Sequence, residues 1–181
     1  MAKPRIATTS LAGCFGCHMS ILDLDEAILD LAEIVDFDRS PVDDIKHVSQ
    51  RCEIGLIEGG CCNAENVEVL REFRRSCDVL VALGDCATMG GIPALRNMVP
   101  LGECLREAYL DGPTVHNPRR RIPDDREIPL LLDRVVPAHE VVRIDVHLPG
   151  CPPPAEAIRR AVVAILTKQA LDLPHGLIRY D

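Results

Sequence analysis

Residues Asp78–Leu83 read DVLVAL, and Gly84 follows them directly. A nearly continuous apolar run that stops at a glycine predicts a short strand buried on both faces, which is typical of a parallel sheet. Shorter runs rich in β-branched and apolar residues predict four further strands, at Arg5–Ser10, Ile34–Phe37, Ile54–Ile57 and Val141–His147.

Segments with apolar residues at helical spacing separate these predicted strands. Strands that alternate with helices favour parallel pairing, so the pattern predicts an α/β fold with a doubly wound parallel sheet. Five prolines between residues 111 and 140 interrupt the alternation and predict a loop-rich insertion there, with a little helix around Leu130–Arg134. The predicted helices are Ser20–Glu33, Asn63–Ser76 and Pro154–Gln169.

The composition is that of a soluble globular protein, with 47% hydrophobic and 27% charged residues in a chain of 181. This length predicts a single domain over residues 1–181. The formal charge of −8 argues against a nucleic-acid partner, because phosphate binding requires a basic face. Insertion into a membrane is not expected, because no apolar stretch approaches the roughly 20 residues that span a bilayer.

Nine cysteines are too many, and odd in number, for a disulfide framework in a chain that can build its own core. Metal or redox chemistry in a reducing compartment explains them better. Leu11–Cys14 resembles a lipoprotein cleavage box, but Thr8, Thr9 and Ser10 interrupt the apolar core that a secretory signal needs. We therefore expect a protein that is not exported and that works in the cytoplasm.

Six cysteines follow the predicted strands closely. In a parallel sheet the carboxyl ends of the strands share one edge, and such folds place their sites in the crevice outside that edge. Residues far apart in the sequence are therefore expected to converge there. The six are Cys14, Cys17, Cys61, Cys62, Cys86 and Cys151.

Converging thiolates are the ligands of iron–sulfur clusters. The Cys14-x-x-Cys17 loop can supply two ligands, and two later cysteines can complete a set of four, which leaves the choice among the six open. Zinc is the rival metal, but its sites usually consist of two Cys-x-x-Cys pairs, and this chain has one. A thioredoxin-like role for this pair, or c-type haem attachment at Cys14–His18, explains fewer of the cysteines.

The remaining candidates each have two interpretations. Cys52, Cys77 and Cys104 are expected to be buried small hydrophobic residues. His18 is either a hydrogen-bond donor to a ligand sulfur or an ordinary polar residue. Glu58 is a candidate proton relay, or else a solvated or paired carboxylate.

Two nucleotide-related signals are weak or missing. The hydroxyl-rich stretch Thr8–Ser10 is a weak signal for a flavin phosphate. The chain has neither a G-x-G-x-x-G motif after a strand nor a Walker A motif, so we do not expect it to bind NAD itself.

Three motifs taken together resemble the small subunit of nickel–iron hydrogenases: Cys14-Phe-Gly-Cys17, Gly84-Asp-Cys86 with Gly90-Gly91, and Pro149-Gly-Cys151-Pro-Pro. The subunit of respiratory complex I that carries its terminal cluster shares the last two motifs. The resemblance implies a flavodoxin-like domain that holds one 4Fe–4S cluster, beside the nickel–iron centre of a partner large subunit. It implies no catalytic residue in this chain. The implied cluster ligands are Cys14, Cys17, Cys86 and Cys151.

Two features make the chain look like the short small subunit of cytoplasmic NAD-reducing (bidirectional) hydrogenases. No cysteine follows Cys151, and no export signal precedes the first strand. The resemblance then implies a subunit of a hydrogen:NAD⁺ oxidoreductase (hydrogen dehydrogenase) that is not catalytic alone. Its implied partners carry a nickel–iron centre, FMN and further iron–sulfur clusters.

Two alternatives stay open. One is an electron-transfer subunit of a complex I-like oxidoreductase linked to quinone or ferredoxin, and the other is a non-catalytic zinc or sensor module. The complex I relative has adjacent cysteines in its first strand loop, whereas the tandem Cys61-Cys62 follows a later strand here. We therefore do not assign to Cys61 or Cys62 the role that the adjacent cysteines have in the complex I relative.

Overall fold

The computed structural model describes residues 3–178 and contains a five-stranded parallel sheet with the order β2-β1-β3-β5-β7. This is the strand order of the flavodoxin-like doubly wound fold, so the predicted fold class is confirmed. A separate two-stranded antiparallel sheet joins β4 to β6. The strands are β1 (Arg5–Ser10), β2 (Asp36–Phe37), β3 (Cys52–Glu58), β4 (Cys61–Asn63), β5 (Cys77–Leu83), β6 (Leu131–Val136) and β7 (Val146–Leu148).

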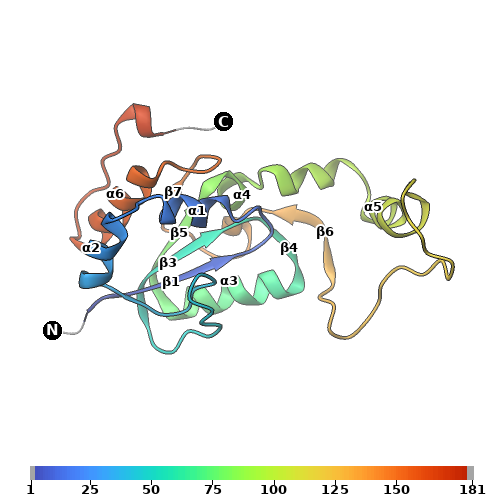
Figure 1. Cartoon of the computed structure of the whole chain (residues 1–181), viewed down its shortest axis with the longest axis horizontal. Helices are drawn as coiled ribbons and strands as arrows, with labels where there is room; N and C mark the ends of the chain where they lie inside the picture. Colours follow the sequence, from blue (N-terminus) through green and yellow to red (C-terminus); the bar gives the residue numbers. More distant parts are fainter. Residues whose placement is uncertain (1–2, 179–181) are drawn as a thin grey trace.

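Helices cover both faces of the parallel sheet (Figure 1). Those on one face pack with the core that contains Ile54 and Ile158, and the helix on the other face packs with the core that contains Leu70 and Phe73. The α-helices are α1 (Gly16–Leu22), α2 (Ala27–Ile34), α3 (Ala64–Ser76), α4 (Gly84–Met89), α5 (Leu101–Arg106) and α6 (Ala155–Leu166). Short 3₁₀ helices are η1 (Ile92–Met98), η3 (Ala138–Glu140) and η4 (His175–Leu177), and η2 (Glu107–Asp111) is π-helical.

Alternation along the strands separates the two cores. Successive side chains of β3 point to opposite faces, so Ile54 and Leu56 join the core beneath α1, α2 and α6. Ile57, in contrast, joins the core beneath α3.

Helix α3 begins at a regular cap, because the Asn63 side chain accepts a hydrogen bond of 2.8 Å from the amide of Asn66.

The parallel register places the ends of four strands side by side. Ser10 is paired with Glu58, Glu58 with Leu83, and Leu83 with Leu148. The loops after β1, β3, β5 and β7 therefore leave the sheet along one edge, which is the geometry that the sequence predicted for its cysteines.

The prediction of a single helix at Ser20–Glu33 was wrong. The chain forms α1 and α2 instead, and Asp25 between them has a positive φ of 53°. Asp23, Asp25 and Glu26 explain the break, because carboxylates are unfavourable at the negative C-terminal end of α1 and favourable at the N-terminal end of α2.

The helix predicted around Leu130–Arg134 was also wrong, because β6 occupies this position. Cys61 pairs with Val136 in antiparallel fashion, so β6 depends on a partner about 70 residues away, a long-range contact of the kind that local propensity cannot reveal. We call residues 99–131 the arm; they hold α5 and η2, and they extend away from the main sheet (Figure 1).

Other predicted bounds shift by a few residues. The strand predicted at Val141–His147 is shorter and later, as β7, because η3 takes up the start of that segment. The last helix spans Ala155–Leu166, with Pro154 preceding its first turn. Within residues 3–178, no helix is both long and apolar enough to cross a membrane.

Candidate metal centre

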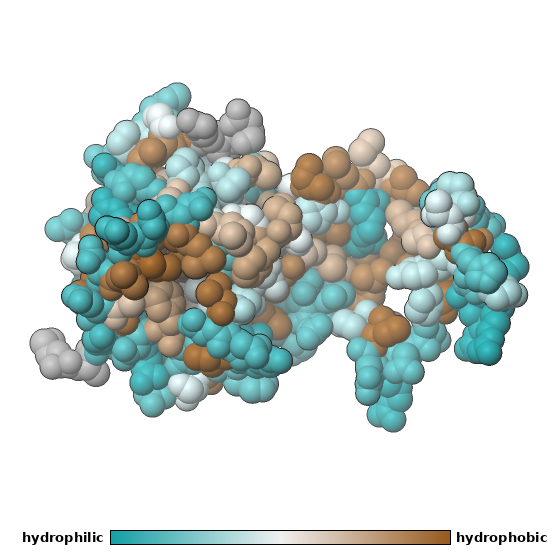
Figure 2. Space-filling model, in the orientation of Figure 1, coloured by the Kyte–Doolittle hydropathy of each residue, from teal (hydrophilic) through white to brown (hydrophobic). Residues whose placement is uncertain are grey.

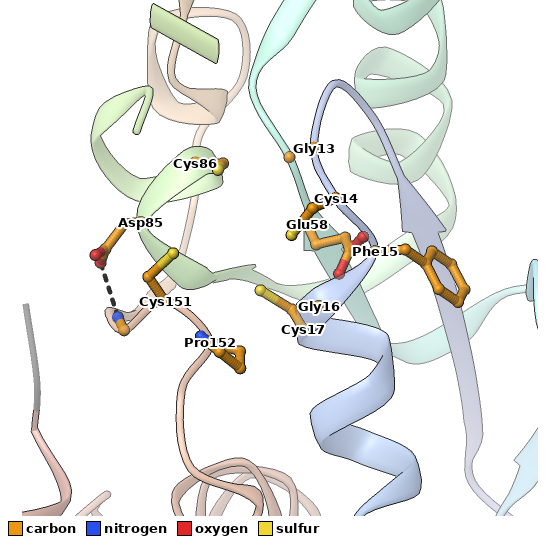
Figure 3. A pocket seen from close by; sticks show the side chains of 12 residues that line it. Gly13, Cys14, Phe15, Gly16, Cys17, Glu58, Asp85, Cys86, Cys151 and Pro152 are labelled. Carbon is orange, nitrogen blue, oxygen red and sulfur yellow. Dashed lines mark hydrogen bonds between the residues drawn. The ribbon is translucent and has the colours of Figure 1, made fainter. Parts of the chain in front are cut away.

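Four cysteines from three separate loops line one cavity of about 60 Å³ at the carboxyl edge of the sheet (Figure 3). Cys14 and Cys17 come from the connection between β1 and α1, and Cys17 lies in the first turn of α1. Cys86 lies in α4 directly after β5, and Cys151 follows β7. The structure therefore brings together all four cysteines that the resemblance singled out.

The sulfur atoms of these four side chains point into the space between them (Figure 3). The proximity of the four thiols also affects the pKa of Cys17. Burial raises the pKa of Cys17 far above its usual value, and the charges of Glu58 and of the other three cysteines raise it further. Burial likewise raises the pKa of Cys86, with added contributions from Cys151 and Cys14.

This donor set suits a cluster that carries its own positive charge. In the described residues, the cavity lining contains four thiols and two acidic side chains but no lysine, arginine or histidine that could stabilise a thiolate. Metal ions supply that stabilisation, because a coordinating thiol is deprotonated by the ion it binds. The residues present therefore fit an iron–sulfur cluster, whose ligands are thiolates.

The four cysteines surround a cavity of about 60 Å³. A zinc ion draws its thiolate ligands to about 2.3 Å, so four of them converge on one point. A multi-atom cluster needs space between its ligands instead, and the cavity provides such space.

Glycines keep the walls of the cavity clear. Gly84 has a positive φ of 82°, and a Cβ atom at this position would overlap the sulfur of Cys17. Gly91 has a φ of 49°, and its Cβ would lie 2.9 Å from the sulfur of Cys86. Both positions therefore need glycine for two reasons, backbone conformation and space beside a cysteine sulfur of the cavity.

A reciprocal pair of hydrogen bonds ties two ligand loops together. The amide of Asp85 donates to the carbonyl of Gly150 at 3.0 Å, and the amide of Gly150 donates to the Asp85 carboxylate at 2.7 Å (Figure 3). Asp85 directly precedes Cys86, and Gly150 directly precedes Cys151. Asp85 thus ties together the loops that carry Cys86 and Cys151, two of the expected ligands. Sequence reasoning missed this residue, although it stands inside the Gly84-Asp-Cys86 motif.

Glu58 also lines the cavity, and it is only 2% exposed. Its carboxylate accepts hydrogen bonds from the Ser10 hydroxyl at 2.6 Å and from the His18 amide at 2.9 Å. The structure thus excludes the interpretation of Glu58 as a solvated residue. Burial alone would raise the pKa of Glu58, but these hydrogen bonds and the nearby His18 hold it below its usual value.

His18 is buried rather than directed at a ligand sulfur. Its Nε2 lies 3.0 Å from the Thr8 hydroxyl, and its ring stacks on Phe15 with the centroids 4.6 Å apart. Its Nδ1 lies 3.1 Å from a Glu58 oxygen, but the direction is unsuitable for a hydrogen bond. The distance therefore marks an electrostatic contact, and His18 supports the loop from behind.

Two hydroxyls of the Thr8–Ser10 stretch, those of Thr8 and Ser10, have partners within the chain. Thr8 contacts Ser40 at 3.1 Å as well as His18, and Ser10 donates to Glu58. The stretch borders a second cavity of about 500 Å³, whose lining includes both basic side chains (Arg39, Lys46 and His47) and acidic ones (Asp44, Glu65 and Glu72). This mixed lining does not single out a phosphate, so the flavin-phosphate signal stays a weak one.

The other cysteines lie elsewhere. Cys61 is fully buried in the core beneath α3, and the thiol of Cys62 contacts the Asn66 side chain at 3.3 Å, so neither lines the cavity. Cys52 and Cys77 are fully buried, as expected, and Cys104 is only half-buried. Cys61 and Cys62 follow β3 closely, as expected, but they belong to β4 and are not among the residues that line the cavity.

Comparison with known proteins identifies the family. The model of the NADH ubiquinone oxidoreductase 20 kDa subunit matches residues 14–165. The chain is 43% identical over 180 residues to the delta subunit of the NAD-reducing hydrogenase HoxS of Cupriavidus necator, covering 99% of this chain and 86% of that one. It is 40% identical over 178 residues to a subunit of the F420-non-reducing hydrogenase of Methanothermobacter thermautotrophicus, covering 95% of this chain but only 56% of that one.

Solved structures agree. A chain of an NAD⁺-reducing [NiFe]-hydrogenase in the H₂-reduced state superimposes with a TM-score of 0.95 at 52% identity, covering 99% of this chain and all of that one. A [NiFeSe]-hydrogenase of Dm. baculatum, at 15% identity and a TM-score of 0.57, shares the fold. This chain therefore belongs to the family of the NADH ubiquinone oxidoreductase 20 kDa subunit and, within it, to the small subunits of nickel–iron hydrogenases of the NAD-reducing type.

Proposed function

We propose that this chain is the electron-transfer small subunit of a cytoplasmic NAD-reducing nickel–iron hydrogenase. It would bind one 4Fe–4S cluster through Cys14, Cys17, Cys86 and Cys151, and relay electrons between the nickel–iron site of a large subunit and a flavin-containing NAD module. The observation that carries the proposal is the convergence of these four thiols on one cavity. When bound, such a cluster accepts and returns one electron at a time.

The residues of this chain would set the conditions for that transfer. The cysteines supply the ligands, and the Asp85–Gly150 pair holds two of the ligand loops at a fixed separation. Gly84 and Gly91 let the backbone approach the ligand sulfurs. Hydrogen bonding and burial around sulfur ligands are the means by which proteins tune such centres.

A partner surface is available next to the cavity. Met89 and Met98 are exposed at the end of α4 and in η1, close in sequence to Cys86. Further exposed apolar residues lie in the arm, and Figure 2 shows brown, apolar patches among hydrophilic surface over this part of the molecule. Extended apolar surface marks sites of protein association, which supports docking of the large subunit here.

Anaerobic purification of the complex tests this function. We expect a nickel-containing large subunit and a flavin-containing subunit to co-purify with the chain, and the complex to reduce NAD⁺ with hydrogen. Activity should be lost in a Cys151→Ser variant of the assembled complex. Full hydrogen-dependent NAD⁺ reduction in that variant would refute the proposed role.

The family match to a complex I subunit favours one second candidate, an electron-transfer subunit of a complex I-like oxidoreductase. The same purification separates the two. Co-purification with membrane subunits, without nickel and without hydrogen-dependent activity, would favour the second candidate.

A further inference from the structure

Glu58 is a buried carboxylate in the wall of the cavity, whose lining has no basic side chain among the described residues, while His18, which is not part of that lining, places its Nδ1 3.1 Å from one of the Glu58 oxygens. Charged side chains are almost never fully buried unless they are paired, so its position requires an explanation. It is the last residue of β3, the central strand of the parallel sheet, and it lies close to Cys14 and Cys17 (Figure 3). The main-chain register holds it there, so it cannot withdraw to solvent.

Two hydrogen bonds favour the ionised form of Glu58. One oxygen accepts from the Ser10 hydroxyl at 2.6 Å, and the other accepts from the His18 main-chain amide at 2.9 Å. Both bonds favour the charged form, because each is donated to the carboxylate. A group held as a permanent acceptor is poorly suited to relay protons, and well suited to hold a fixed charge.

The same bonds connect Glu58 to the ligand loop. His18 directly follows Cys17, so the bond from its amide anchors the first turn of α1 to the end of β3. The stacking of the His18 ring on Phe15 anchors the middle of the Cys14–Cys17 loop as well. Glu58 therefore contributes both a charge and a fixed position to the side of the cavity that holds two of the four thiols.

We propose that Glu58 is a positioning and potential-setting residue, which lowers the reduction potential of the group held by Cys14, Cys17, Cys86 and Cys151. This inference rests on the proposed function. Reduction adds one electron to that group and breaks no bond in the chain. A fixed negative charge beside the cavity opposes the added electron, and the burial of Glu58 strengthens the effect because charges interact more strongly away from bulk water.

The test is an EPR-monitored redox titration of the full chain, purified anaerobically together with the subunits that accompany it. Glu58→Gln keeps the size of the side chain and removes its charge. We expect the equilibrium for one-electron reduction to shift about tenfold toward the reduced form, which corresponds to about +59 mV. Glu58→Asp, which keeps the charge, is expected to stay within about threefold of the wild type.

Two further variants separate charge from general disturbance. Asp38→Asn removes another buried carboxylate, 5% exposed, that does not line the cavity, and it should leave the potential near the wild-type value. Ser10→Ala keeps the charge of Glu58 but removes the hydroxyl dipole that partly offsets it. The reduction potential of Ser10→Ala should therefore move downward, in the direction opposite to that of Glu58→Gln. This variant tests the inference independently if Glu58→Gln fails to fold.

Three results would overturn the inference. They are a cluster-loaded Glu58→Gln variant with the wild-type potential, an equal upward shift in Glu58→Asp, and an upward shift in Ser10→Ala. A wild-type chain without iron and sulfide would instead contradict the proposed function itself, so the two failures are distinguishable.

Discussion

Strand β5 has a cysteine near each end, and the two ends treat the thiol differently. Cys77 begins the strand and is completely buried beside Cys52 of β3, with which it is in register. Cys86 follows the other end of the strand and lines the cavity with three more cysteines. The comparison shows that the two ends of one strand place a thiol in different surroundings, one in the packed core and the other in the wall of a cavity.

The physical basis of the difference is what surrounds the sulfur. At the amino end, burial raises the pKa of Cys77 to about 12 and that of Cys52 to about 11, so both stay protonated and pack as small hydrophobic groups. At the carboxyl end, loops that leave the sheet expose Cys14 and Cys151 and leave a space that the sulfurs share. Only the second arrangement is open to a metal.

The largest expected effect comes from moving one thiol out of the ligand set. Cys17→Ser should remove the bound iron and the visible absorption of the protein completely, because a serine hydroxyl is a poor substitute for a thiolate ligand. Cys77→Ser, the matched change at the other end of the sheet, should keep its full iron content. Equal iron content in both variants would show that the thiols at the two ends of the sheet do not differ in metal binding.

Gly84→Ala tests whether the space beside Cys17 is needed. The added methyl would overlap the Cys17 sulfur, and the φ of 82° strains any residue with a Cβ. Strain of this kind costs about 1–3 kcal/mol, and we expect lower iron content together with a lower melting temperature. Gly102→Ala, where the Cβ meets no atom within 4 Å, is the control. Unchanged iron content in Gly84→Ala would mean that the loop has room that the structure does not show.

Asp85→Ala tests the connection between two ligand loops. It leaves the Gly150 amide without its partner, at a cost of about 1–3 kcal/mol, and outer-shell losses of this kind weaken metal binding by about 10–100-fold. Competition with an iron chelator measures the change. Asp85→Asn keeps an oxygen acceptor and should lose much less. If both variants release iron at the same rate, the charge of Asp85 matters rather than its hydrogen bond.

The smallest expected effect concerns the stability of the fold at alkaline pH, and it depends on Cys77 at the amino end of the sheet. The unfolded chain releases the Cys77 proton near its ordinary pKa of 9.0, whereas the folded chain keeps it until about pH 12. Between these values the folded state binds more protons, so stability must fall as the pH rises. Each such thiol contributes a slope of up to about 1.4 kcal/mol per pH unit.

Cys77→Ser should therefore flatten the loss of stability above pH 9 in denaturant titrations of the anaerobic protein. Cys104→Ser, which removes a half-buried thiol on α5, serves as the control and should keep the wild-type slope. An identical alkaline slope in wild type and Cys77→Ser would mean that Cys77 does not stay protonated in the fold.

The sequence predicted the sheet, and the spacing of its cysteines predicted the edge, because both depend on local patterns. DVLVAL at Asp78–Leu83 indicates a buried strand on its own, and the Cys14-x-x-Cys17 loop follows its strand directly. Choosing four ligands among six cysteines required the resemblance. Position relative to a strand did not exclude Cys61 and Cys62, since the pairing of β4 with β6 is a long-range contact.

The supporting residues were harder to predict for the same reason. Asp85 acts through Gly150, and Glu58 through Ser10 and His18, all of which are distant in sequence and meet only in the fold. A polar residue next to a ligand cysteine is a signal that could have drawn attention to Asp85. Nothing in the local sequence distinguishes a buried Glu58 from a solvated one.

The most direct measurement of the central claim is the iron and acid-labile sulfide content of the anaerobically purified wild-type chain, read beside Cys17→Ser. We expect about four iron and four sulfide ions per chain in the wild type and none in the variant. An iron-free wild-type protein, or one with a single zinc ion, would contradict it.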